Sequence, residues 1–167
     1  MKTMVSFKYL EIRGECSMIK RLDIKNRKIA TEILSIQIPS YLVEAKIIGY
    51  YDLPPLKDTI DSLQQCQETF FAYYSQEEVC GIISFKLDGT EIDLHRLIVH
   101  PEHFRKGIAQ KLLDFVETIE GVKSMRTTTG TKNTPAVNFY LKNGFFKLQE
   151  VEIDAHLTLS SFRKYLI

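Results

Sequence analysis

The first third of the chain spaces its apolar residues as an amphipathic helix does. Ile29, Ile33 and Ile36 recur at intervals of three and four residues, which places them on one helical face. Asn26 precedes this run as an N-cap and Pro39 follows it, so a helix is expected between them. Two more helical segments are expected, over residues 40–48 and, beyond the Pro54-Pro55 pair, over residues 56–63.

From residue 69 onward the pattern becomes that of strands. Residues 69–74 are rich in aromatic side chains, residues 79–87 are apolar and β-branched, and Asp88-Gly89 suits a tight hairpin turn. A strand is also expected from Met18. The later pattern predicts a helix after Pro101 that ends at Gly121, a strand over residues 123–129, a short helix from Thr134 to Gly144, and strands over residues 145–153 and 157–167.

The strand that begins at Glu91 changes its alternation part-way along. Ile92 and Leu94 alternate with polar residues, so one face of the strand is polar. The apolar run over residues 97–99 then occupies the parity that was polar before. A continuous pleat cannot reconcile the two halves with one buried face, so an extra residue, a β-bulge, is expected near residues 96–98. A strand end that is buried on both faces would give the same pattern.

The composition indicates one globular domain with its own core, because 44% of the 167 residues are hydrophobic and 26% are charged. The net charge of +1 provides no field for holding a polyanion, so we expect no nucleic-acid partner. No apolar run reaches the roughly 20 residues of a bilayer span, and the N-terminus lacks a signal-peptide core, so we expect a cytoplasmic protein without a membrane partner. Met18 is a second plausible start, which suggests that residues 1–17 are an optional extension of a domain over residues 18–167.

Metal binding is not expected from the sequence. His95, His100 and His103 are close along the chain, but a strand end, a proline and a loop separate them, and no helical HExxH or cysteine accompanies them. The three cysteines are odd in number and form no CxxC, which argues against a disulfide framework or a thiolate metal site. Reduced, mostly packed thiols are expected at Cys16, Cys66 and Cys80.

The sharpest chemical signal follows the irregular strand. The run Arg105-Lys106-Gly107-Ile108-Ala109 brings two basic side chains, a glycine and a small residue to the start of a helix. A first helical turn has unpaired backbone N–H groups and the positive end of the helix dipole, while Gly107 and Ala109 allow a ligand to approach the backbone. This arrangement suits a pyrophosphate, although the same residues could simply begin a helix.

Together with its surroundings, this run resembles the GNAT superfamily of N-acetyltransferases. A strand ending at His100-Pro101, the basic run, a helix, a threonine-rich strand and the segment NTPAVNFYLKNGF at residues 133–145 follow in that family's order. The likeness covers residues 69–153 strongly and the part from Met18 more loosely. One departure is Phe104, because the family usually has Gln or Arg three residues before the glycine; Arg105 or Lys106 would then supply the charge.

The resemblance implies a single α/β (α+β) domain. Its mixed, mostly antiparallel sheet would be splayed at the bulged central strand and flanked by about four helices. Acetyl-CoA would bind where that strand separates from the strand over residues 123–129, its pantetheine arm pairing with the backbone of Leu97, Ile98 and Val99. The pyrophosphate would lie on Arg105, Lys106, Gly107, Ile108, Ala109 and Gln110.

Two side chains match further members of the family's site. Asn133 matches an asparagine that contacts the cofactor, and Tyr140 matches a tyrosine near the thioester sulfur. From the residues alone, Asn133 could equally be an ordinary helix cap and Tyr140 a core aromatic. A tyrosine with a pKa near 10 is a weak proton donor to a thiolate whose thiol has a pKa near 8.5, so we expect Tyr140 to act chiefly as a hydrogen-bond donor.

The reaction implied by the resemblance is direct attack of a primary amine on the thioester. An amine with a pKa of about 10.4 must lose a proton at pH 7, which costs about 4.6 kcal/mol and calls for a base or a water chain. The polar face of Glu91, Asp93 and His95 leads toward the cofactor. Asp93 fills the position of the glutamate base in histone-type members, and His95 is chemically the easier base. Pairing of this face with neighbouring charges, with water as the base, is the alternative.

The expected function is therefore an acetyl-CoA-dependent N-acetyltransferase for a small-molecule amine. A non-catalytic acyl-CoA sensor and a transferase for protein or peptide amines stay open as alternatives. No motif names the acceptor: Tyr41, Glu44, Tyr50 and Asp52 could bind a cation or could form helix surface. Dimers are common in the family, so a homodimer also stays open.

Overall fold

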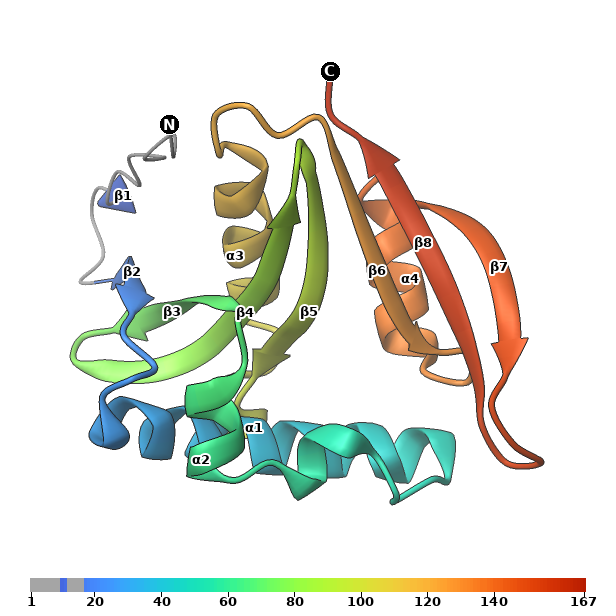
Figure 1. Cartoon of the computed structure of the whole chain (residues 1–167), viewed down its shortest axis with the longest axis horizontal. Helices are drawn as coiled ribbons and strands as arrows, with labels where there is room; N and C mark the ends of the chain where they lie inside the picture. The colour runs from blue at the N-terminus through green and yellow to red at the C-terminus, as the bar shows by residue number, and fades with distance from the viewer. Residues whose placement is uncertain (1–9, 12–16) are drawn as a thin grey trace.

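Eight strands form one mixed sheet in the computed structural model, which describes residues 10–11 and 17–167 (Figure 1). The strands are β1 Leu10–Glu11, β2 Ser17–Leu22, β3 Thr69–Ser75, β4 Glu78–Asp88, β5 Glu91–Val99, β6 Ser124–Gly130, β7 Phe146–Glu152 and β8 Thr158–Tyr165. Their order is β1-β2-β3-β4-β5-β6-β8-β7, and all neighbours are antiparallel except β5 and β6. The expected α+β class and mostly antiparallel sheet are confirmed.

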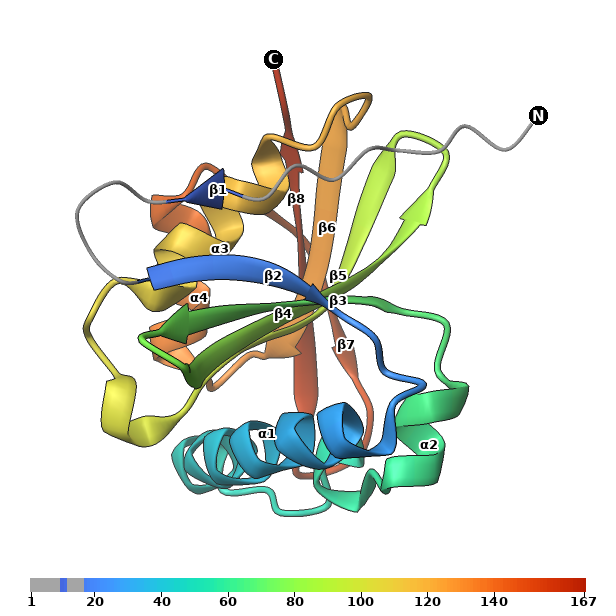
Figure 2. The same ribbon diagram turned by 90° about the vertical axis from the view of Figure 1, so that its left-hand side faces the viewer.

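Helices cover both faces of this sheet, as Figures 1 and 2 show. The helical elements are α1 Arg27–Ile48, η1 Pro54–Lys57, α2 Ile60–Gln65, η2 Pro101–His103, α3 Ile108–Glu117 and α4 Thr134–Lys142, where η marks a 3₁₀ turn. Alternate residues of the sheet serve the two faces: Phe70 and Ile82 pack with α1 and α2, and Phe71 and Ile83 pack with α3 and α4. Within the described part of the chain, no helix combines the length and apolar character needed to cross a membrane.

The predicted extension over residues 1–17 lies largely outside the described residues. β1 pairs with β2 through Leu10 with Ile19 and Glu11 with Met18, and β2 begins at Ser17. The strand expected from Met18 is therefore confirmed, whereas the division of the chain into an extension and a domain stays a prediction.

The helix boundaries differ from the prediction at Pro39. One continuous helix, α1, runs through this proline, so the expectation of separate helices over residues 26–39 and 40–48 is wrong. An interior proline costs about 3 kcal/mol, because it removes one hydrogen bond and crowds the preceding turn. Tyr41 and Ile48 beyond it remain buried against the sheet side of the helix, and this packing outweighs the cost. The segment expected as one helix over residues 56–63 is divided between η1 and α2, because Thr59 caps α2.

A β-bulge interrupts β5 at His95. Ser84 of β4 pairs with Arg96 and Phe85 pairs with Leu94, which leaves His95 as the extra residue. The predicted bulge is thus confirmed, one residue earlier than expected. The insertion reverses the faces: Leu94 lies in the core under α3, whereas Arg96 faces the α1 side of the sheet.

β5 and β6 separate just beyond this bulge. Their parallel pairing extends only from Glu91 with Ser124 to Leu94 with Thr127. Beyond that point β5 continues with β4 and β6 continues with β8. Figure 1 shows the two strands diverging toward the end of the sheet where α1 lies. We call this divergence the fork; its presence confirms the expected splay of the sheet.

Candidate active site

The fork exposes one backbone edge of β5. The N–H of His100 donates to the carbonyl of Cys80 across the β4–β5 pair (2.9 Å). Since backbone groups alternate between the two sides of an antiparallel strand, the N–H and C=O groups of Leu97 and Val99 turn away from β4 and toward the fork. The backbone of Ile98 turns toward β4 instead, and its side chain is buried among residues of the α1 face. Of the three predicted pantetheine contacts, two therefore present backbone groups to the fork.

The start of α3 adjoins the end of β5 and has open amides. Among the α-helices of the described chain, α3 alone begins without a side-chain cap. Its first intrahelical bond runs from the N–H of Lys111 to Gly107 (3.0 Å), so the amides of residues 108–110 have no intrahelical acceptor. Arg105 and Gly107 both have positive φ, 61° and 75°, which shapes a turn of the kind that gathers amides around an anion. The predicted pyrophosphate residues thus form one continuous segment, which consists of the turn at residues 105–107 and the start of α3.

The basic side chains of this turn are exposed. Arg105 and Lys106 lie on the surface, and Lys106 Nζ donates to His103 Nδ1 at 3.3 Å. Phe104, which departs from the family pattern, is 40% exposed and places no charge in the turn. The Gln110 side chain donates to Asn143 Oδ1 (2.6 Å) and so links α3 to α4. Gln110 can therefore offer a ligand its backbone amide rather than its side chain.

A glycine in β4 allows α3 to begin close to the sheet. A Cβ atom added to Gly81 would lie 2.7 Å from Ile108 Cγ2 and 3.1 Å from the Ile98 carbonyl oxygen, closer than packing allows. Gly81 also pairs with Val99 at the end of β5. The sequence analysis missed this residue, although a glycine inside an apolar strand is a signal of close backbone approach.

Tyr140 reaches the apex of the fork from the α4 side. Its ring packs against Phe145 and Phe162, at 5.3 and 6.0 Å between centroids, so the core interpretation of this residue is confirmed. Its hydroxyl is hydrogen-bonded with Thr127, the last β6 residue paired with β5. Burial raises the pKa of Tyr140 to about 12, and the Thr127 bond opposes that rise. The phenol therefore keeps its proton at neutral pH, as a hydrogen-bond donor requires. Thr127 was not predicted.

Asn133 joins the start of α4 to α1. Its Oδ1 accepts from the Ala136 N–H (3.4 Å), which confirms the capping interpretation, and its Nδ2 donates to Thr129 Oγ1 (3.4 Å). The same side chain hydrogen-bonds to the carboxyl of Glu44. Burial raises the pKa of Glu44, and the hydrogen bond from Asn133 lowers it in part. A desolvated carboxyl thus lies beside the fork, close enough to Tyr140 to influence its pKa.

The two predicted base candidates lie together on the α1 side of the sheet. His95 Nε2 is 3.4 Å from Asp93 Oδ2, and His95 Nδ1 is 3.4 Å from Glu68 Oε1. Asp93 also accepts from Arg126 Nη2 at 3.0 Å. Glu91, the third member of the predicted polar face, pairs with Arg163 and Arg126. This face is therefore paired with neighbouring charges, and Asp93 and His95 form one connected group at the bulge.

A buried polar network supports this group from behind. The Arg96 guanidinium donates to Gln37 Oε1 (3.0 Å), to Asp58 Oδ2 (2.9 Å) and to Glu68. Glu68 additionally accepts from the Ser84 hydroxyl (2.6 Å). The network joins α1, the turn before α2, and the second half of β5. Sequence reasoning missed it, because its members lie up to 59 residues apart along the chain.

The other residues proposed for a cationic acceptor lie in different surroundings. Tyr41 is buried in α1, and burial together with nearby Glu44 raises its pKa well above the usual range. The Tyr50 hydroxyl donates to Asp154 (3.1 Å), and Asp52 forms an ion pair with Lys57. Of these four predicted residues, Tyr41 and Glu44 are the two that interact electrostatically with Tyr140.

The sequence can be compared with a protein family and with a bacterial relative. Residues 66–147 match the family described as the acetyltransferase (GNAT) domain. The chain is 38% identical over 149 residues to the UPF0157 protein YqkA of Bacillus subtilis (strain 168). That alignment covers 89% of this chain and 43% of YqkA, so the chain spans less than half the length of this relative.

Solved acetyltransferases share the fold. PaiA N-acetyltransferase from Thermoplasma acidophilum, solved in complex with coenzyme A, is 20% identical, with a TM-score of 0.69 and coverage of 89% of this chain and 98% of that one. The ribosomal-protein-S18-alanine N-acetyltransferase from Escherichia coli is 14% identical, with a TM-score of 0.71 and coverage of 90% and 94%. A spermidine N-acetyltransferase chimera from Vibrio cholerae and hSSAT is 17% identical, with a TM-score of 0.67 and coverage of 90% and 95%. Residues 66–147 therefore match a GNAT acetyltransferase domain, and the chain has the GNAT fold.

Proposed function

We propose that the protein transfers an acetyl group directly from acetyl-CoA to the primary amine of a small molecule. The observation that carries this proposal is the fork between β5 and β6, with the Tyr140 hydroxyl at its apex beside Thr127. A strand edge with unpaired amide and carbonyl groups offers hydrogen bonds to an extended ligand that carries amides of its own. The pantetheine arm of coenzyme A is such a ligand.

The pyrophosphate of the same ligand would lie on the turn before α3. The open amides of residues 108–110 and the positive end of the helix dipole favour an anion there. Arg105 and Lys106 add positive charge at the surface. Bound in this way, acetyl-CoA would supply an activated acetyl thioester, and its sulfur would lie near the fork apex.

The residues around the apex would have different roles in the reaction. Tyr140 would donate a hydrogen bond to the sulfur as negative charge develops on it, because its raised pKa keeps the phenol protonated. Asp93 and His95 would accept the proton of the attacking amine, directly or through water, and Glu68 would hold the imidazole in place. Glu44 supports a cationic acceptor, since an ammonium group beside this desolvated carboxyl would restore its favourable interactions.

The test is release of free thiol from acetyl-CoA in the presence of an amine panel. The panel contains polyamines, aminoglycosides, amino acids and a lysine peptide, and thermal stabilisation by coenzyme A is measured in parallel. We expect stabilisation by coenzyme A and thiol release with at least one small amine. Stabilisation without thiol release from any amine would favour the sensor function, and release with the peptide alone would favour the peptide transferase. If coenzyme A gave no stabilisation and acetyl-CoA released no thiol with any amine, a coenzyme A site at the fork would be refuted.

A further inference from the structure

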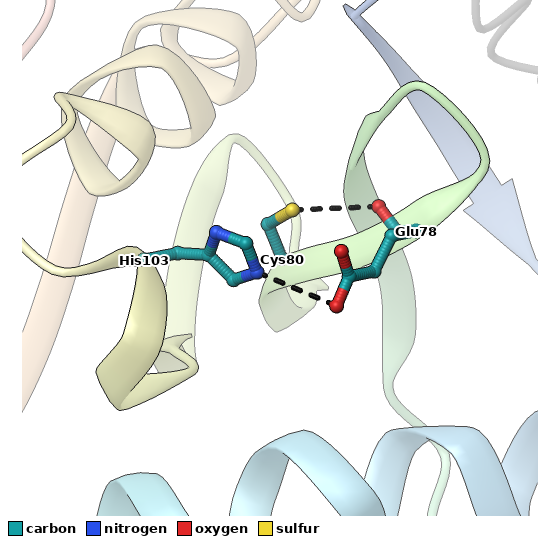
Figure 3. Close-up of side chains that lie close together, drawn as sticks. All are labelled: Glu78, Cys80 and His103. Atoms are coloured by element: carbon teal, nitrogen blue, oxygen red, sulfur yellow. Dashed lines mark hydrogen bonds and ion pairs between the residues drawn. The ribbon is translucent and has the colours of Figure 1, made fainter.

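Three side chains with metal-binding atoms meet beside the turn that precedes α3 (Figure 3). Glu78 and Cys80 come from β4, and His103 comes from η2. His103 Nε2 lies 3.5 Å from Glu78 Oε1, and one ligand atom from each of the three residues lies within 4.8 Å of the others. Cys80 is buried, His103 is half-buried and Glu78 is exposed. The proposed transfer reaction uses none of them.

Local backbone features bring these residues together. In the pairing of β3 with β4, Tyr73 pairs with Gly81 and Tyr74 with Val79, so Cys80 is the extra residue of a bulge. Bulges redirect a side chain relative to regular alternation. η2 in turn begins at Pro101 and is capped by the His100 side chain, which accepts from the Glu102 N–H (3.3 Å). This short, capped turn directs His103 toward β4.

We propose that Glu78, Cys80 and His103 bind one divalent cation of the zinc class. Thiolate, imidazole and carboxylate are the ligands that zinc prefers, and three protein ligands with one open position are a common zinc arrangement. Ligand atoms around tetrahedral zinc lie about 3.5 Å apart, so the present group needs to contract by roughly 1 Å. On binding, the thiol proton of Cys80 passes to solvent. The thiolate and the carboxylate then balance the two positive charges of the metal.

The surroundings favour entry of a cation at this point. An open hollow of about 450 Å³ adjoins the site and includes Glu78 in its lining. Glu32, Glu77 and Glu102 also line it, with His100 as the nearest further imidazole. Four carboxylates around one concave surface raise the local concentration of cations, and the hollow leaves room for water at the fourth metal position.

The metal would act on the coenzyme turn through His103 and Lys106. Lys106 Nζ now donates to Nδ1 of His103, while Nε2 faces Glu78. A metal bound at Nε2 leaves the imidazole proton on Nδ1, which then cannot accept a hydrogen bond from Lys106. The Lys106 ammonium group becomes available to an anion on the turn. This coupling rests on the proposed function, whereas the metal site itself does not.

The direct test is titration of the whole chain, after treatment with a chelator, with Co²⁺ as a spectroscopic probe of zinc sites. We expect one equivalent of Co²⁺ to give a thiolate-to-cobalt charge-transfer band and tetrahedral d–d bands, both removed by competing Zn²⁺. Cys80→Ser should abolish the charge-transfer band, and His103→Gln should weaken Co²⁺ binding by at least about 100-fold. Glu78→Gln, at an exposed position, should also weaken it.

Matched control variants make the result decisive. Cys66→Ser changes the other described free thiol, and His156→Gln changes an exposed imidazole outside the proposed ligand set. Both should retain the wild-type spectrum. Absence of the charge-transfer band in the wild type, its survival in His103→Gln, or its loss in Cys66→Ser would each overturn the site. Should the buried Cys80→Ser variant fail to fold, His103→Gln and Glu78→Gln still decide the question.

The coupling has its own measurement. We expect saturating Zn²⁺ to strengthen coenzyme A binding by about fivefold or more, and coenzyme A to strengthen Zn²⁺ binding by the same factor, as linkage requires. Lys106→Met should remove this mutual effect while leaving the cobalt spectrum intact. Metal binding with unchanged coenzyme A affinity would overturn the coupling. Metal binding without any coenzyme A binding would refute the proposed function and leave the metal site standing.

Discussion

The two halves of β5 differ in what lies beside them. Residues 91–94 have a strand on each side, β4 and β6, whereas residues 95–99 have only β4. In the first half, Asp93 and Glu91 meet arginines at the surface of the closed sheet. In the second half, Arg96 is buried in a polar network and a backbone edge is open.

One inserted residue accounts for this difference. The bulge at His95 reverses the faces of the strand, so that Arg96 points toward α1 instead of into the apolar core around Leu94. The network of Arg96 then holds the second half of β5 against α1 and the turn before α2 without any help from β6. A strand can therefore separate from its neighbour and remain ordered when side-chain hydrogen bonds replace the missing backbone hydrogen bonds.

The largest expected effect comes from removing the Arg96 guanidinium, which holds this side-chain network together. Arg96→Met should lower the free energy of unfolding by about 3–5 kcal/mol, because Glu68 and Asp58 would be left buried without their cation. Arg126→Met, the matched change in the first half, should cost no more than about 1 kcal/mol, since this guanidinium is 41% exposed. Urea unfolding of both variants measures the contrast.

A double variant checks the assigned cause. Adding Glu68→Gln to Arg96→Met removes the orphaned carboxylate and should restore about 1 kcal/mol or more. Equal costs for Arg96→Met and Arg126→Met would show that the two halves of β5 do not differ in the way described.

These features differ in how far the sequence could reveal them. The parity change between Leu94 and residues 97–99 is local, so it predicted the bulge to within one residue. The caps at Asn26 and Asn133 are likewise local. The run of α1 through Pro39 could not be predicted, because it depends on packing of the helix against a sheet formed by distant residues.

The candidate site shows the same contrast between features that are local in the sequence and features that depend on distant residues. Tyr140, Asn133 and the turn at Gly107 carry motifs whose spacing is visible in the chain. Their partners do not: Thr127 and Glu44 become neighbours of Tyr140 only when β6 and α1 meet at the fork. The sequence therefore indicated candidate site residues, and the fold was needed to determine what surrounds them.

The second prediction concerns the close approach of α3 to the open half of the sheet. Gly81→Ala should cost about 1–3 kcal/mol of stability, because the added Cβ would press against Ile108 and the carbonyl of Ile98. Displacement of the α3 start should also weaken coenzyme A binding by about tenfold, measured by calorimetry. Lys86→Ala, an exposed change opposite Asp93, should alter both quantities little. Tight coenzyme A binding by a destabilised Gly81→Ala variant would separate the α3 turn from the ligand site.

The third prediction concerns the apex, where the closed and open halves meet. Tyr140→Phe should lower the turnover number by about 10- to 100-fold, because the hydrogen bond to the leaving sulfur is lost. The dissociation constant for coenzyme A should change less than about threefold, since the ring packing is retained. Steady-state kinetics and direct binding distinguish the two quantities. Unchanged turnover would remove Tyr140 from the mechanism.

The smallest expected effect is that substitutions of two glutamates change the free energy of unfolding at pH 7 in opposite directions. Burial raises the pKa of Glu44 beside the fork above its ordinary value of 4.5. A carboxyl with a raised pKa stabilises the folded state below the unfolded pKa, and this contribution is lost as the pH rises through the folded pKa. Glu44→Gln should therefore gain stability relative to the wild type between pH 4 and pH 7. Glu91→Gln, in the closed half, should lose up to about 1 kcal/mol at pH 7, because it breaks ion pairs with Arg126 and Arg163.

Denaturant unfolding at several pH values measures both glutamate variants against the wild type. The decisive quantity is the change of the stability difference with pH, because it cancels every group that the variants share with the wild type. If Glu44→Gln lost stability steadily from pH 4 to pH 7, the carboxyl would be favourably paired in its charged form, and the fork would already contain the cation that we assign to an acceptor. If Glu91→Gln gained stability at pH 7, its arginine pairs would not hold the closed half. A gain of stability in Glu44→Gln and a loss in Glu91→Gln at pH 7 are what an open fork and a closed sheet, formed by one strand, require.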